Sequence, residues 1–187
     1  VYSANLELSF EGVYNAPNGN TKLLGDYISN NGFYFMLFKD VQTNQLTLVQ
    51  ASEEGIDEFE ISSIPSKTIY ETIFLTVGDT LSILGVYRDN MRKIPSNQPP
   101  YNANGIFFHQ FDYKKRKDIQ SGYIEISRDF ITQGWSDKEI KKALREEKKG
   151  NWHPSLKSLH IKSLKQQKDG SSILILEQSF KTVSAYS

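Results

Sequence analysis

The side chains best suited to metal or acid–base chemistry in this chain are its three histidines, His109, His153 and His160. None has a second histidine or a carboxylate at a metal-binding spacing such as His-x-x-x-His. The absence of cysteine also excludes cysteine-bound zinc, iron–sulfur clusters and a thiol nucleophile. His109 stands between Phe108 and Phe111 in a β-rich segment, which favours a position on a strand face. We therefore expect no metal site and no cofactor.

Carboxylates form two adjacent pairs, Glu53–Glu54 and Asp57–Glu58. Hydrolysis of a glycosidic bond needs two carboxylates that face one cleft, about 5–9 Å apart. A cluster of acids in a predicted loop is instead typical of a solvated turn. The chain also lacks the motifs of the hydrolase nucleophile elbow, the phosphate-binding loop and the dinucleotide-binding turn. The sequence therefore predicts no catalytic residue. Three further aspartates at strand ends or turns are expected to accept backbone hydrogen bonds: Asp40, Asp112 and Asp169.

Basic side chains gather in two segments, the run Lys114–Lys117 and residues 138–149. Such clusters can bind the phosphates of nucleic acids. The first cluster, however, is expected at a hairpin tip, where lysines are common. The second contains acidic residues three or four positions from basic ones, as on a solvated helix surface. Nucleic acid is therefore not the partner we expect. The side chains that we assign to a partner-binding surface are Trp135, Trp152, His109, Lys114 and Arg116.

Length and composition limit the kind of protein that holds these side chains. The 187 residues suit a single domain, residues 1–187. No apolar run approaches the roughly 20 residues of a membrane-spanning helix, and the first residues show no apolar signal core. The net charge of zero conceals two unlike halves. Residues 1–90 carry 12 acidic and 4 basic side chains, and residues 91–187 carry 10 acidic and 18 basic ones. We expect no membrane-spanning segment.

The elements that must position these side chains repeat along the sequence. The segment Gly19–Tyr27 is echoed by Gly78–Tyr87 and, more weakly, by Asp169–Glu177. Each copy begins with a turn signal and continues into an apolar β-rich run, which predicts a hairpin turn followed by a strand. Similar β-rich runs precede and follow these copies. The repeating unit is therefore four strands in an antiparallel meander.

A repeated four-stranded meander is typical of a β-propeller blade, although blades in well-known repeat families span about 40–45 residues. We predict an all-β, propeller-like chain with blade-like units at 5–64 and 66–127 and half a unit at 155–187. Because known propellers have about 4–8 blades, we expect a fragment of a larger propeller that self-associates or is completed by further blades. Residues 53–58 are expected to extend a loop. The strands predicted in the first unit are 5–10, 19–27, 31–38 and 45–49.

One segment departs from the β pattern. Ser136 and Glu139 form the Ser-x-x-Glu pattern of a helix capping box, and Gly150 stands where a helix would end. The sequence therefore predicts one inserted helix over 136–149. Its apolar positions are few, so we expect it on the surface with a narrow stripe docked.

Short motifs spaced along residues 60–187 resemble a family of uncharacterised secreted proteins from Bacteroidetes. The motifs are Leu84–Tyr87, Gly105–Phe108, Ile131–Ser136, Asp169–Gly170 and Leu176–Gln178. Those proteins look like propellers, and no activity or catalytic residue is established for them. The resemblance implies a protein that is secreted, periplasmic or on the cell surface.

Two functions of different classes remain open at this point. The first is a non-catalytic β-propeller module, secreted or on the cell surface, that binds a glycan or a protein partner through its loops. The alternative is a propeller-type glycan-active enzyme whose catalytic residues lie mainly outside this chain. Acidic or histidine clusters at matching positions of the units would favour the enzyme, and the sequence shows none.

Overall fold

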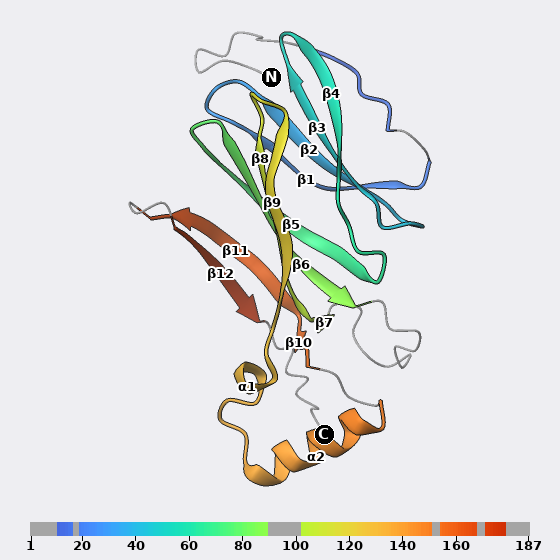
Figure 1. The fold of residues 1–187 in the computed structure, drawn as a ribbon, viewed down its shortest axis with the longest axis vertical. Coiled ribbons are helices and arrows are strands. Elements are labelled where there is room, and N and C mark those ends of the chain that lie inside the picture. Colours follow the sequence, from blue (N-terminus) through green and yellow to red (C-terminus); the bar gives the residue numbers. More distant parts are fainter. Residues whose placement is uncertain (1–10, 17–18, 90–101, 151–153, 168–170, 179–187) are drawn as a thin grey trace, which may run out of the picture.

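The structure is a computed structural model that describes residues 11–16, 19–89, 102–150, 154–167 and 171–178. Its strands form two four-stranded antiparallel sheets, one two-stranded hairpin and a short two-stranded bridge (Figure 1). The predicted all-β, antiparallel character is therefore confirmed. All of these sheets are open, and closure of a propeller ring stays a prediction.

The first sheet is a meander of four consecutive strands. They are β1 (Thr21–Ile28), β2 (Tyr34–Asp40), β3 (Leu46–Ser52) and β4 (Gly55–Ile61). The loop predicted at residues 53–58 is wrong, because most of that segment belongs to β4. Its acidic residues conceal an alternation in which Phe59 packs on the core and Ile61 is fully buried. The predicted strand at 5–10 lies outside the described residues.

The second sheet has the strands and the order expected for the unit at 66–127. They are β5 (Lys67–Val77), β6 (Thr80–Asp89), β8 (Gly105–Asp112) and β9 (Lys117–Glu125). A third layer is the hairpin of β11 (Leu159–Gln166) and β12 (Ser172–Gln178), which corresponds to the predicted half unit. The bridge pairs β7 (Asn102–Ala103) with β10 (Leu156–Lys157).

Two apolar clusters hold these layers together, one on each face of the second sheet. The main cluster fills the space between the first and second sheets and includes Phe35, Leu48, Leu81, Phe107 and Phe111. A smaller cluster lies between the second sheet and the β11–β12 hairpin and includes Val86 and Leu159. The second sheet is therefore the middle layer of three, which explains why β8 is apolar on both faces.

β1 and β5 approach each other closely where the first two sheets cross. A Cβ on Gly25 would lie 2.8 Å from both the Phe74 ring and the Thr72 hydroxyl. The Thr72 hydroxyl donates a hydrogen bond of 3.2 Å to the backbone carbonyl of Leu24. From β2, the buried Lys39 ammonium donates a 3.0 Å hydrogen bond to the carbonyl of Ile69 in β5. These contacts fix how the first sheet sits on the second.

Two helices follow β9. The predicted helix is confirmed as α2 (Asp137–Lys148), in which Ser136 and Glu139 form the reciprocal hydrogen bonds of a capping box. A four-residue helix that the sequence did not indicate, α1 (Arg128–Ile131), precedes it and is capped by Ser127. In the part of the chain that the structure describes, no helix has the length and apolar character needed to span a membrane.

The aromatic packing between the first two sheets yields a stability prediction. The Phe111 ring is 1% exposed, and its centroid lies 4.6 Å from that of Phe59 on β4. We expect Phe111→Ala to lower the free energy of unfolding by about 3–5 kcal/mol, because it removes a buried aromatic ring and leaves a cavity. Urea denaturation measures the change.

The matched control is Phe130→Ala, at a ring that is 62% exposed. Its free energy of unfolding should stay within about 0.5 kcal/mol of the unmodified protein. Equal stability of the two variants would contradict the packing described here.

Candidate functional site: a polar groove on the first sheet

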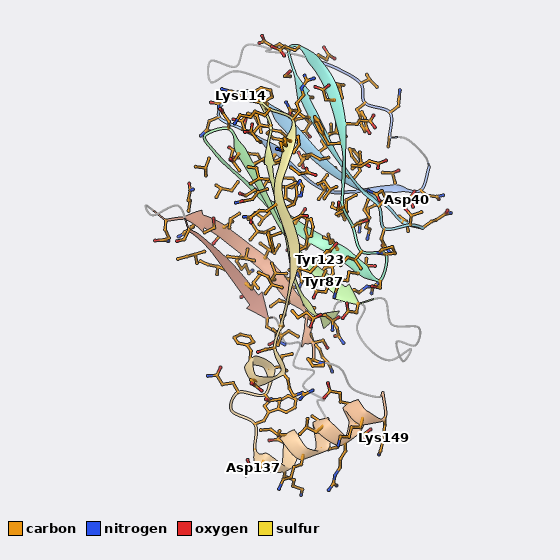
Figure 2. All side chains as sticks on the ribbon, in the orientation of Figure 1. Asp40, Tyr87, Lys114, Tyr123, Asp137 and Lys149 are labelled. Atoms are coloured by element: carbon orange, nitrogen blue, oxygen red, sulfur yellow. The ribbon has the colours of Figure 1, made fainter. Side chains whose placement is uncertain are left out.

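A groove of about 510 Å³ lies on the face of the first sheet that points away from the second sheet. Alternation along the strands places apolar side chains on the inner face and polar ones here. The groove is lined by Thr21, Asp40, Thr43, Gln45, Thr47, Glu58 and Glu60. Figure 2 labels Asp40, which lies at the end of β2.

Strand register brings the central groove residues together. Thr47 in β3 pairs with Phe38 of β2 on one side and with Glu60 of β4 on the other. Glu58 lies two residues from Glu60 on the same face of β4. The Thr47 hydroxyl and the Glu60 carboxylate make no hydrogen bond or ion pair with the described residues, so both can bind a ligand.

The β2–β3 turn shapes one end of the groove. Asp40 accepts hydrogen bonds of 2.8 Å from the backbone N–H groups of both Gln42 and Thr43. This is the backbone-accepting role predicted for Asp40. The Gln45 amide donates to the carbonyls of Leu46 and Ile61, at 3.1 and 3.0 Å. The turn therefore holds its polar side chains in fixed positions.

Two aromatic rings lie close to residues that line the groove. The Tyr14 and Phe38 rings lie 5.3 Å apart, centroid to centroid, and Phe38 is the cross-strand neighbour of Thr47. Burial and, second, the neighbouring Glu58 carboxylate raise the pKa of the Tyr14 hydroxyl. Tyr14 therefore remains protonated at neutral pH, with its hydroxyl oxygen buried in the protein.

The lining residues determine which ligands suit the groove. It combines three carboxylates with hydroxyl and amide groups and has no basic side chain. Such a surface accepts hydrogen bonds from hydroxyl-rich or cationic molecules and repels anions. Among the described residues, no group of three or more carboxylate or histidine side chains could hold a metal ion.

The carboxylate pair Asp57–Glu58 does not face a common cleft, because consecutive strand residues point to opposite faces. Glu58 lines the groove, whereas Asp57 forms an ion pair of 2.9 Å with Arg116 from the second sheet. Arg116, assigned to a binding surface from the sequence, therefore joins the two sheets.

His109 is not at the surface. Its side chain is 1% exposed and lies between the parallel rings of Phe107 and Phe111 on the inner face of β8. This is the strand-face position that the sequence favours, and it removes His109 from any exposed binding surface. Asp118 Oδ1 lies 3.4 Å from its Nε2.

The other residues assigned to a binding surface do not gather at one place. Lys114 lies in the β8–β9 turn, where it forms an ion pair of 3.0 Å with Asp79. Trp135 is 38% exposed and lies in the loop before α2. Figure 2 shows Asp137, the first residue of α2, at the end of the molecule opposite Lys114. Trp152 lies outside the described residues. The sequence therefore did not indicate the groove.

A second polar cluster, on the second sheet, surrounds the ammonium group of Lys67. The Lys67 ammonium lies 4.3 Å from the centre of the Tyr87 ring and 5.8 Å from that of Tyr123. It also forms ion pairs with Asp89 at 2.9 Å and with Glu125 at 3.7 Å. The two tyrosines lie near the middle of the molecule in Figure 2. With its charge compensated, Lys67 stabilises the second sheet and is not a ligand site.

No protein-family model, curated protein or solved structure matches this chain. The resemblance to secreted Bacteroidetes proteins stays a prediction, and the groove is interpreted from its own geometry.

The buried position of His109 yields a pH prediction. Burial lowers the pKa of its imidazole, and the Asp118 carboxylate opposes this only in part. The unfolded chain takes up a proton near pH 6.5, whereas the folded chain resists it. The free energy of unfolding should therefore fall as the pH drops below about 6.5. Urea titrations at several pH values measure it.

We expect His109→Leu to reduce this acid-side loss of stability. His160→Leu, at a side chain that is 47% exposed, is the control and should retain it. An unchanged slope in His109→Leu would show that other groups cause the loss.

Proposed function

We propose that this protein is a non-catalytic module that binds carbohydrate in the groove of the first sheet. The observation that carries the proposal is the cross-strand set of Thr47, Glu58 and Glu60 beside the Tyr14–Phe38 aromatic pair. Carboxylates and hydroxyls can bind the hydroxyl groups of a sugar, and an aromatic ring can pack on its apolar face.

The charge of the groove narrows the class of carbohydrate. Its three carboxylates favour neutral sugars and amino sugars and disfavour uronic acids and sulfated sugars. A protein partner would need a lysine or arginine at this position. The groove's volume of about 510 Å³ suits a short stretch of glycan.

We further propose that the three layers are consecutive units of a β-propeller. Two features support this. The second sheet is covered on both faces by its sequence neighbours, as a blade is. The first strands of its unit and of the next carry the same irregularity, a register shift between Ile69 and Glu71 in β5 and between Ile161 and Ser163 in β11. We place the module outside the cytoplasm, as the resemblance to secreted proteins implies.

Isothermal titration calorimetry of the full chain against neutral, amino and acidic oligosaccharides tests the proposal. Suitable probes are cello-oligosaccharides, chitosan oligosaccharides and oligogalacturonates. We expect binding to the neutral or the amino sugars and none to the oligogalacturonates. Thr47→Val should weaken binding about three- to tenfold, because it removes a hydroxyl group. Glu60→Gln should weaken it by about tenfold or more, because it removes the negative charge and replaces an acceptor oxygen with an NH2 donor.

The control is Glu54→Gln, which removes an exposed carboxylate that does not line the groove. It should bind like the unmodified protein. Failure to bind any neutral or amino sugar, or equal binding by all three variants, would contradict the proposal. Cleavage of the bound oligosaccharide would instead support a glycan-active enzyme.

A further inference from the structure

The helix α2 lies across the end of the molecule farthest from the first sheet (Figure 1). One of its faces is shielded from solvent, since Ala143 is buried and Ile140 and Leu144 are partly buried. Its other positions are rich in basic side chains. These are Lys138, Lys141, Lys142, Arg145 and Lys148, followed by the C-cap residue Lys149.

The spacing of these basic residues places them on one stripe. Steps of three or four residues along an α-helix keep side chains on the same face. The stripe therefore extends from Lys138 to Lys148, roughly 15 Å at 1.5 Å per residue. At 100° per residue, the buried Ala143 falls on the opposite side of the helix. The stripe thus lies opposite the buried side of the helix and is exposed to solvent.

The acidic residues of α2 do not neutralise this stripe. Glu139 accepts hydrogen bonds from the backbone N–H and hydroxyl of Ser136 in the capping box, at 2.8 and 2.7 Å. Glu147 forms an ion pair of 2.6 Å with Arg128 of α1. Glu146 forms an ion pair of 3.0 Å with Lys149. The sequence suggested that these carboxylates would pair with the lysines of the helix. In the structure, Glu139 and Glu147 instead bind Ser136 and Arg128, and Glu146 pairs with the C-cap residue Lys149.

Five cations of the stripe consequently have no carboxylate partner among the described residues. They are Lys138, Lys141, Lys142, Arg145 and Lys148. The other basic cluster differs in this respect. Lys114, Lys115 and Arg116 of the β8–β9 turn each form an ion pair, with Asp79, Asp112 and Asp57 respectively. Only the helix, of these two clusters, presents a row of unpaired positive charge.

Exposed aromatic rings lie in the segment that leads into the helix. Phe130 is 62% exposed and Trp135 is 38% exposed. Exposed aromatic rings combined with a basic helix face are typical of proteins that contact the headgroup region of a membrane. A nucleic acid duplex would bind the cations but would leave Phe130 without a contact.

We propose that α2 docks this protein onto an anionic membrane surface. The apolar side chains of the helix are already shielded from solvent, fully at Ala143 and partly at Ile140 and Leu144, so we expect the helix to lie on the surface without inserting. Attraction between the five cations and anionic headgroups supplies the binding, with Phe130 and Trp135 adding contact at the interface. Binding is therefore weakened by salt. The proposal does not depend on the groove or its ligand.

Vesicle co-sedimentation of the full chain tests this. The probes are vesicles of phosphatidylcholine mixed with phosphatidylglycerol, and vesicles of phosphatidylcholine alone. We expect binding to the anionic vesicles only, and its loss at high salt. Each cation removed should weaken binding about fivefold, so the triple variant Lys141→Gln, Lys142→Gln, Arg145→Gln should bind roughly 100-fold more weakly.

The matched control is the triple variant Lys114→Gln, Lys115→Gln, Lys117→Gln, which removes the same charge from the opposite end of the molecule. It should bind anionic vesicles like the unmodified protein, and so should the groove variant Thr47→Val. Equal loss in both triple variants, or equal binding to neutral vesicles, would overturn the proposal. So would binding to duplex DNA without binding to anionic vesicles, which would assign the stripe to nucleic acid.

Circular dichroism verifies that the helix persists in both triple variants.

Discussion

The layer of aromatic rings between the first and second sheets is the interaction on which the rest of the structure depends. Phe35, Phe59, Phe111 and Tyr113 meet there with ring centroids 4.6 to 5.4 Å apart across the two sheets. The Tyr113 hydroxyl also donates to the carbonyl of Gly78 and accepts from the Asn31 amide, at 2.8 and 2.9 Å. Once the inner face of the first sheet is buried in this layer, alternation turns its polar residues outward. The groove is a consequence of that packing.

The β11–β12 hairpin packs on the face of the second sheet that points away from the first sheet. The Glu71 carboxylate of β5 accepts a 3.1 Å hydrogen bond from the backbone N–H of Ile161, next to the cluster that holds Val86 and Leu159. This fixes the β11–β12 hairpin, while β9 leads on to the two helices. The acidic groove therefore lies on the first sheet and the basic stripe lies on α2, at the end of the molecule away from that sheet (Figure 1). This placement is in keeping with the acidic and basic halves of the sequence.

Sequence alone predicted the features that depend on neighbouring residues. The capping box of Ser136 and Glu139, the hydrogen bonds accepted by Asp40, and the strands of the second sheet all follow from local patterns. Features that depend on pairing between distant segments were not predicted. Thr47 meets Glu60 only through strand register, and Asp57 meets Arg116 only because two sheets stack. β4 was missed because its acidic residues obscured the inward-facing Phe59 and Ile61. The unpaired state of the basic side chains of α2 could not be predicted either, because residue spacing alone suggested that the acidic side chains of the helix would neutralise its lysines.

Native-state amide hydrogen exchange measures whether the second sheet is the middle of three layers. Amides of β6 and β8 are hydrogen-bonded on both sides and covered on both faces, whereas β4 and β12 each lack a strand neighbour on one side among the described residues. We expect the amides of Leu81, Ile83 and Phe107 to exchange only through global unfolding, and those of β4 and β12 to exchange faster. Exchange in β6 and β8 as fast as in β12 would contradict the three-layer stack.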